Sequence, residues 1–181
     1  MSHRKLVYYV AITVDHFIAH EDGSVGGFLE QGHHIPDYIN SLRDYDTVIV
    51  GKNTYEVGYT YGLVAGEPVP TYAHMMQYVF SQSMPEYHHP QLQVIRQDPA
   101  EFMTQLKAKT GGNIYLCGGG QLAGYLLSHR LIDSLILKVN PVLFGAGIPL
   151  FGASSQQIAL TLCDSKIYAN GVIFSHYAIT Y

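Results

Sequence analysis

The chain has 181 residues, of which 48% are hydrophobic and 13% are charged, and its formal net charge at pH 7 is −4. This composition excludes a disordered chain, and the lack of a basic cluster disfavours nucleic acid as a partner. No apolar stretch reaches the roughly 18 residues that span a bilayer. We therefore expect one domain over residues 1–181, with no membrane or nucleic-acid partner.

Apolar runs bounded by turn residues predict strands and helices that alternate along the chain. Residues 6–14, rich in Val, Ile and Tyr, predict a buried first strand, and residues 15–32, which hold four glycines, predict a long loop that could close over a cleft. Further strands are predicted at 47–50, 78–80, 92–95, 114–117 and 134–139. Helices are predicted at 36–44, 53–57, 98–109 and 121–128.

Two alternating segments, residues 158–168 and 172–181, end the chain and are joined at Asn170-Gly171. Asn-Gly between alternating segments is typical of a β-hairpin. The order of the elements thus predicts an α/β fold, with a mostly parallel central sheet, flanking helices and a C-terminal antiparallel hairpin.

Cysteine and histidine usage predicts neither a disulfide nor a metal site. Cys117 and Cys163 both lie in apolar segments, so we expect buried free thiols and a reducing compartment, the cytoplasm. The pairs His33-His34 and His88-His89 lack Cys, Asp or Glu partners at zinc-ligand spacing, and we interpret them as loop histidines.

The segment 113–127, NIYLCGGGQLAGYLL, joins a predicted strand to a predicted helix through Gly118, Gly119 and Gly120. Such a turn directs backbone N–H groups and the positive end of a helix at one place, which suits a phosphate. A tight connection without a ligand is the alternative. The segment does not match a Rossmann fingerprint, because Lys138 stands where the ribose-binding acid would be.

Two more predicted strands end in residues that suit phosphate. The first is followed by Gly51, Lys52, Asn53 and Thr54, and the second by Ser81-Gln82-Ser83. Because ligands of open α/β sheets bind beyond the carboxyl ends of the strands, the three turns together favour a dinucleotide. A solvated lysine and turn-forming serines are the alternatives.

Four segments carry a resemblance to a known family: VAITVDHFIA (residues 10–19), VIVGKNTYE (48–56), IYLCGGGQL (114–122) and GAGIPLF (145–151). Over nearly its full length the chain resembles the dihydrofolate reductase-like superfamily. It looks most similar to the stand-alone relatives of the riboflavin-biosynthesis reductase domain, the 5-amino-6-(5-phosphoribosylamino)uracil reductase-like branch.

The resemblance implies a dihydrofolate reductase-like fold with about eight strands in the sheet and NADPH as cofactor. By analogy, the nicotinamide would be bordered by Ala11 and Ile18, and the adenosine ribose and its phosphates by Gly51, Lys52, Asn53 and Thr54. The adenosine side would be held by Ser81, Gln82 and Ser83. The pyrophosphate would be held by Gly118, Gly119, Gly120, Gln121 and Leu122, with Cys117 near the floor of the cleft.

The chain also departs from the folate enzymes of that superfamily. Asp37 lies near the place of their substrate-binding carboxylate and is the one candidate for a catalytic acid, although a helix acid favoured by the dipole is the alternative. Ala123 stands where those enzymes usually carry an aromatic residue, and His16 replaces a common glycine. Both differences weaken the expectation of true dihydrofolate reduction.

We therefore predict an NADPH-dependent reductase that transfers hydride to a small pteridine- or pyrimidine-like heterocycle. The tyrosines Tyr55, Tyr59, Tyr61 and Tyr72 suggest a flat acceptor, or equally a tyrosine core or dimer face. A non-catalytic NADP(H)-binding module and a purely structural dimeric domain remain as alternatives. A homodimer is expected, because the long terminal hairpin needs cover.

Overall fold

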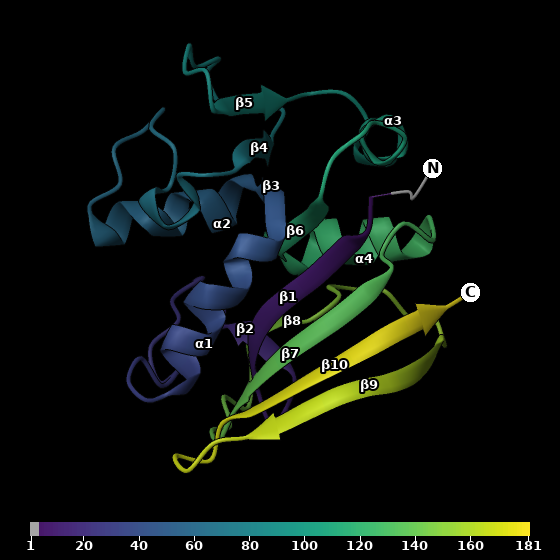
Figure 1. Cartoon of the computed structure of the whole chain (residues 1–181). Helices are drawn as coiled ribbons and strands as arrows, with labels where there is room; N and C mark the ends of the chain where they lie inside the picture. Colours follow the sequence, from purple (N-terminus) through teal and green to yellow (C-terminus); the bar gives the residue numbers. More distant parts are fainter. Residues whose placement is uncertain (1–3) are drawn as a thin grey trace.

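The computed structural model describes residues 4–181, so residues 1–3 of the predicted domain lie outside it. An eight-stranded sheet forms the centre of the molecule, with helices on both faces (Figure 1). The strand order is β5 (Leu92–Ile95), β4 (Met76–Phe80), β3 (Tyr45–Gly51), β6 (Asn113–Gly118), β1 (Leu6–Thr13), β7 (Ser134–Asn140), β10 (Ile173–Thr180) and β9 (Ala159–Ile167). All pairs from β5 to β7 are parallel, and the pairs of β10 with β7 and β9 are antiparallel. The predicted fold class is confirmed.

The α-helices that connect these strands are α1 (His34–Ser41), α2 (Lys52–Val57), α3 (Pro99–Lys107) and α4 (Gly120–Ser128). Short 3-10 turns lie at Leu42–Asp44, Gly58–Tyr61 and Pro70–Tyr72. The start of α3 is as predicted, because the Asp98 carboxylate accepts hydrogen bonds from the backbone N–H groups of Ala100 and Glu101 at 2.9 and 3.0 Å. No helix within residues 4–181 combines the length and the apolarity that crossing a membrane requires.

The two faces of the sheet carry separate hydrophobic cores. Tyr8 and Val10 of β1 pack in one core with side chains of α3 and α4, whereas Val7 and Tyr9 pack in the other with side chains of β3 and α2. Side chains of a strand point alternately to opposite faces, so a strand covered on both faces must be apolar throughout. This explains the unbroken apolar run that predicted β1.

The predicted loop of residues 15–32 contains a short strand, β2 (Phe17–Ala19), which pairs antiparallel with β8 (Ile148–Pro149). The contact requires glycine at position 147, because a Cβ there would lie 2.4 Å from the carbonyl oxygen of Ala19. A pairing of so few residues across more than a hundred positions has no local periodicity, so the sequence did not reveal it.

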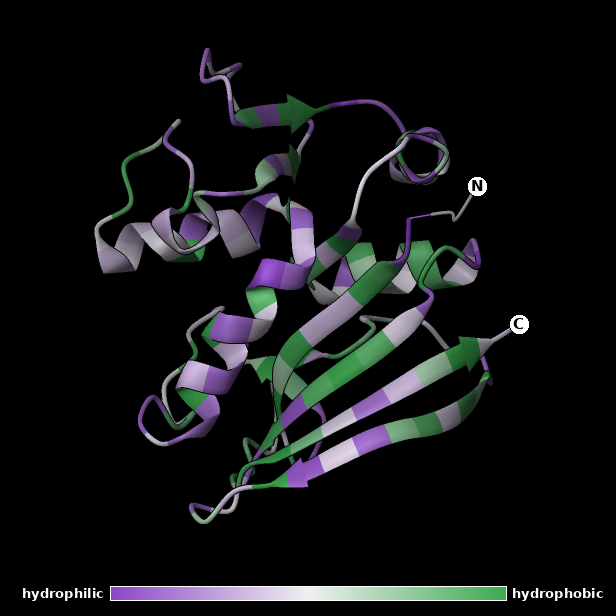
Figure 2. Cartoon of the chain, in the orientation of Figure 1, coloured by the Kyte–Doolittle hydropathy of each residue, from purple (hydrophilic) through white to green (hydrophobic). Residues whose placement is uncertain are grey.

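The C-terminal hairpin forms as predicted, and Gly171 in its turn has φ +87°. Every residue of the edge strand β9 is exposed, and Figure 2 shows hydrophilic residues interrupting it, whereas β7 is largely hydrophobic. Cys163 lies on β9, so the expectation of a buried thiol is wrong there. His34, expected in a loop, is instead the buried first residue of α1, and its ring nitrogen bonds the carbonyl of Leu29 at 3.0 Å.

Candidate active site

A cleft of about 730 Å³ opens at the carboxyl ends of β3, β6 and β1, and α1 and α2 contribute to its lining. Figure 1 shows where these strands and helices lie. Most of the residues predicted to bind the cofactor line it. They are Ala11, Ile18, Gly51, Lys52, Asn53, Thr54, Cys117, Gly118, Gly119, Gly120, Gln121 and Leu122. The sheet therefore brings together two of the three turns that the sequence singled out.

The consecutive glycines of the β6–α4 turn have different roles. Gly119 has φ +88°, and a Cβ on it would lie 3.4 Å from Oγ1 of Thr54, across the cleft between the two turns. A Cβ on Gly120 would instead lie 2.2 Å from the carbonyl oxygen of Pro149. Gly120 is thus required for packing against the backbone, whereas Gly119 leaves space within the cleft.

The third predicted turn lies beside the cleft rather than on its lining. Ser81 is a turn former, since its hydroxyl accepts hydrogen bonds from the N–H groups of Ser83 and Met84 at 3.2 and 3.0 Å. The hydroxyl of Ser83 accepts a 3.1 Å hydrogen bond from the ammonium of Lys52. Gln82 donates to the carbonyl of Arg96 at 2.7 Å. The lysine is therefore the link between this turn and the cleft.

Tyrosine hydroxyls and a thiol on the cleft lining form a connected polar cluster. The hydroxyl of Tyr38 lies 3.0 Å from that of Tyr115 and 3.4 Å from that of Tyr72. The Tyr72 hydroxyl lies 3.2 Å from Sγ of Cys117. Burial raises the pKa of Tyr38 to about 12 and raises that of Cys117, so these groups hold their protons at neutral pH. We call these four residues the tyrosine cluster.

Of this cluster, Tyr72 and Cys117 were predicted from the sequence as site residues, whereas Tyr38 and Tyr115 were not. Tyr115 could have been predicted from the sequence, because residues two apart on a strand share a face and Cys117 was expected at the floor of the cleft. Of the other tyrosines that suggested a flat acceptor, Tyr55 and Tyr61 line the cleft and Tyr59 does not. Nothing local marks Tyr38, which reaches the cluster from α1.

Asp37 does not lie on the cleft lining. Its carboxylate accepts hydrogen bonds from the ammonium of Lys166 at 2.5 Å and from the hydroxyl of Tyr168 at 2.8 Å. Both hydrogen bonds lower the pKa of Asp37, and the one from Lys166 contributes the most. The carboxylate thus connects α1 to the terminal hairpin.

Residues 15–32 form a wall of the cleft, to which Gly23, Val25 and Phe28 contribute. The wall is held from outside, because the ring of Phe28 stacks on that of Phe144 with 5.3 Å between centroids. The carboxylate of Asp15 also accepts a 2.8 Å hydrogen bond from the N–H of Gly145. The predicted loop is therefore positioned as a cover of the cleft.

The charged residues on the cleft lining are both cations. Within the described residues, Lys52 and Lys138 line the cleft and no carboxylate does. The chain as a whole has a net charge of −4, so this lining differs in sign from the molecule that carries it. Such a cleft suits an anionic ligand.

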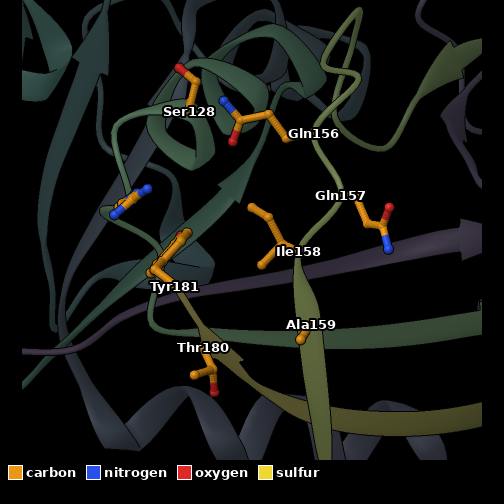
Figure 3. Close-up of a pocket in the computed structure, with 8 residues that line it drawn as sticks. Ser128, Gln156, Gln157, Ile158, Ala159, Thr180 and Tyr181 are labelled. Carbon is orange, nitrogen blue, oxygen red and sulfur yellow. The ribbon is translucent and has the colours of Figure 1, made fainter.

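A second concavity of about 400 Å³ lies at the other end of α4 and contains none of the predicted site residues (Figure 3). In Figure 3 the side chain of Gln156 extends toward Ser128, whereas Gln157 points away from both. In residues 4–181, no three His, Cys, Asp or Glu side chains gather in a way that could hold a metal ion. The cleft is therefore the candidate active site.

Comparisons with known proteins agree with this architecture. The family model of the RibD C-terminal domain matches residues 4–174. The Uncharacterized protein YwjB of Bacillus subtilis (strain 168) is 34% identical over 170 residues, which cover 93% of this chain and 95% of YwjB.

Solved structures share the fold at lower identity. A putative riboflavin biosynthesis protein from Shewanella sp. PV-4 superposes with a TM-score of 0.79 at 19% identity and covers 98% of this chain and 99% of its own. A pyrimidine reductase-like protein from Corynebacterium diphtheriae has a TM-score of 0.70 at 17% identity, with 98% and 92% covered.

Proposed function

This chain belongs to the family of the RibD C-terminal domain, and from that membership and the cleft we propose that it is an NADPH-dependent reductase of a small heterocycle. The observation that carries the proposal is a cleft to whose lining residues 4–181 contribute no carboxylate, and in which a glycine turn and a lysine-bearing turn face each other. A dinucleotide with several phosphates suits this lining, since backbone N–H groups, a hydroxyl and a cation surround the open space.

The residues around Gly119 fit the cofactor. The absence of a side chain at Gly119 leaves the space beside Thr54 free, where the pyrophosphate would lie. Lys52, bonded to Ser83, would meet the phosphate on the adenosine ribose that distinguishes NADPH from NADH. Ala11 and Ile18 would border the nicotinamide on the wall formed by β1 and β2.

When bound, NADPH supplies the hydride; the chain supplies position and exclusion of water. Residues 15–32 cover one side of the cleft, which limits access of water to the reacting atoms. The tyrosine cluster offers hydroxyls to the polar edge of a flat acceptor. Because burial raises the pKa values of Tyr72 and Tyr115, both serve as hydrogen-bond donors and not as acids.

The acceptor is a pteridine- or pyrimidine-like ring in this proposal. Tyr38, Tyr72 and Tyr115 present apolar ring surface together with hydroxyls, which is how aromatic side chains hold a flat polar heterocycle. The name of the structurally similar pyrimidine reductase-like protein agrees with this class of substrate.

A module that binds NADP(H) without turnover is the second candidate, and the position of Asp37 outside the cleft lining favours it. The two candidates share the cofactor site and differ only in whether an acceptor is reduced. A purely structural dimeric domain would have neither property.

Turnover separates the candidates. Purified protein is incubated with NADPH and a panel of oxidised pteridines and pyrimidines, and loss of the dihydronicotinamide absorbance is followed together with the reduced product by mass spectrometry. Reduction of at least one acceptor by the wild type, and none by Gly119→Val, supports the reductase. NADPH binding without reduction of any acceptor would favour the binding module, and no NADPH binding would leave the structural domain.

A homodimer is part of the proposal. The edge strand β9 leaves Leu160, Leu162 and Ile167 exposed by 46, 55 and 76%, and an exposed apolar edge is a place for pairing with another chain. Sedimentation analysis of the wild type and of Leu162→Lys tests this. The wild type is expected to sediment as a dimer and the variant to shift toward monomer; a monomeric wild type would contradict it.

A further inference from the structure

The cleft extends along α2 beyond the proposed phosphate site. Thr54, in the first turn of α2, lies beside the glycine turn, and Tyr61 ends the 3-10 turn that continues α2. At a rise of about 1.5 to 2 Å per residue, the two backbone positions are roughly 10 to 14 Å apart. Both residues line the cleft, so the cleft reaches well past the place where the pyrophosphate would lie.

The lining beyond that place is apolar. It consists of Val57, Gly58 and Tyr61, from the end of α2 and the turn after it, and of Val69 and Tyr72, from the segment before β4. We call these five residues the apolar arm of the cleft. Tyr72 also belongs to the tyrosine cluster, so the apolar arm begins where the proposed acceptor ring would lie.

The two sides of the apolar arm are packed together through Leu63. A Cβ on Gly58 would lie 2.7 Å from Cδ2 of Leu63, so this side chain packs directly on the backbone at Gly58. Leu63 also packs against the same hydrophobic core as Val69 and Tyr72. The apolar arm is therefore one continuous surface and not a set of unrelated side chains.

Two buried polar side chains hold the wall of the apolar arm in place. Gln77, which is 2% exposed, accepts a 2.8 Å hydrogen bond from the N–H of Val69 and donates one to its carbonyl at 3.0 Å. The hydroxyl of Tyr55 donates to the carbonyl of Glu67 at 2.7 Å and accepts from the N–H of Gly66 at 3.1 Å. Because these polar atoms are bonded to the backbone, the wall is fixed and presents apolar side chains to a ligand.

The acids that are close in the sequence do not reach the apolar arm. Neither Glu56 nor Glu67 lines the cleft, and the carboxylate of Glu67 lies 4.0 Å from Nε2 of His89. Tyr61 leaves 68% of its surface exposed although it lines the cleft. An apolar group of a ligand that covers this ring would be removed from water together with it, which is favourable, whereas a charged group would find no partner there.

We propose that the apolar arm binds an uncharged apolar substituent of the acceptor, so that the substrate is a flat heterocycle that bears an alkyl-like group. This inference rests on the proposed reductase function and narrows its substrate class. Tyr61 acts in it as a residue that determines specificity through contact with the substituent and not with the reacting ring.

Paired probes of equal size test the inference. The affinities of 6-propylpterin and 6-(2-hydroxyethyl)pterin, and of the corresponding pair of 6-substituted uracils, are measured by calorimetry. The proteins are the wild type, Tyr61→Ser, Tyr61→Phe, Val57→Thr and Val64→Ser. Val64 is 66% exposed and does not line the cleft, so its variant is the matched control for the loss of an exposed apolar side chain.

For at least one ring, we expect the wild type, Tyr61→Phe and Val64→Ser to bind the propyl probe roughly tenfold more tightly than the hydroxyethyl probe. Tyr61→Ser should reduce the preference to within about threefold, and Val57→Thr, which places a hydroxyl in the apolar arm, should reduce it in the same direction. Equal binding of both probes by the wild type, no binding of either propyl probe, or an unchanged preference in Tyr61→Ser would overturn the inference.

NADPH titrations of the same proteins separate this inference from the proposed function. Tyr61→Ser should bind NADPH like the wild type. If the wild type binds NADPH but shows no preference for the propyl probes, the inference fails and the reductase proposal stands. If Tyr61→Ser loses NADPH affinity and retains the preference, the apolar arm belongs to the cofactor site and the inference fails. Absence of NADPH binding by the wild type would overturn the proposed function and the inference with it.

Discussion

The two halves of the cleft are built by different means. Around Gly119 and Thr54 the lining consists of turns that directly follow β6 and β3, and its open space exists because side-chain atoms are absent. Around Tyr38, Tyr115 and Lys138 the lining consists of side chains from α1, β6 and β7. We call the first part the glycine half and the second the tyrosine half. Ligand binding in the glycine half should therefore be weakened by added side-chain atoms, and ligand binding in the tyrosine half by removal of polar atoms.

Added volume in the glycine half should have the largest effect. Gly119→Val places a branched side chain against Thr54 and demands φ +88° from a residue that disfavours it. We expect NADPH affinity to fall by about 100-fold or more, equivalent to roughly 2.7 kcal/mol. Calorimetric titration with NADPH measures this.

Gly62→Val is the matched control, because Gly62 has φ +86°, open space around its Cβ position and no place on the cleft lining. It should bear similar backbone strain and bind NADPH normally. Unchanged NADPH affinity in a folded Gly119→Val protein would remove this turn from the cofactor site.

Removed polar atoms in the tyrosine half should have a smaller effect, confined to the acceptor. Tyr38→Phe removes the hydroxyl that lies between those of Tyr72 and Tyr115. Loss of one hydrogen bond to the acceptor is worth about 1 kcal/mol, so kcat/KM should fall roughly five- to tenfold while NADPH affinity stays within about twofold. Steady-state kinetics with an acceptor found by the turnover assay measures this.

Tyr181→Phe controls for lost stability, since its hydroxyl also donates a 2.8 Å hydrogen bond, to the carbonyl of Ile132, outside this cleft. Both variants should melt at slightly lower temperature than the wild type. Equal kinetic losses in the two variants would show that the tyrosine cluster acts only through folding.

Removal of the positive charge of Lys52, at the edge of the glycine half, should have a more modest effect on cofactor binding. Lys52 is partly exposed and pairs with Glu56 at 3.8 Å and with Ser83. Lys52→Ala should reduce the preference for NADPH over NADH by about fivefold, and salt should weaken the wild-type preference in the same direction. Lys109→Ala, an exposed lysine elsewhere, is the comparison. A preference that does not change in Lys52→Ala would assign the ribose phosphate to another residue.

Asp37 lies in neither half, and its replacement should have the smallest effect on turnover. We expect Asp37→Asn to change kcat by less than about twofold, because the carboxylate is bound to Lys166 and Tyr168 outside the cleft lining. A tenfold fall in kcat with intact NADPH binding would instead restore the acid role that the resemblance implied.

The same substitution should affect stability in a pH-dependent way. The pKa of Asp37 is lowered in the folded protein, so its stabilising contribution is present above the ordinary carboxylate pKa of 3.8 and is lost as the pH falls through the lower folded value. Thermal melts should thus show the wild type above Asp37→Asn at pH 7 and the two converging in acid.

The glycine half was predictable because each of its turns is contiguous in the sequence. A strand, glycines and a helix stand next to each other in residues 113–127, and the open conformation of Gly119 follows from that order. Lys52 and Thr54 follow β3 in the same manner. Local chemistry was therefore sufficient to name these residues.

The tyrosine half was only partly predictable because it is assembled by packing. Tyr38, Tyr72 and Tyr115 are far apart in the sequence, and no spacing rule shows that their hydroxyls meet. Cys163 illustrates the same limit, since an apolar strand pattern does not reveal whether the strand lies inside the sheet or at its edge. The hydroxyl and thiol groups that meet in the tyrosine half of the cleft could therefore be identified only from the structure.

The most direct test of the account is a calorimetric titration of the purified wild-type protein with NADPH and, separately, with NADH. We predict binding of NADPH that is roughly tenfold or more tighter than binding of NADH, because in the proposed cofactor site Lys52, bonded to Ser83, would meet the distinguishing phosphate. Binding of neither dinucleotide by protein shown to be folded would contradict the account and leave the glycine turn as a purely structural connection.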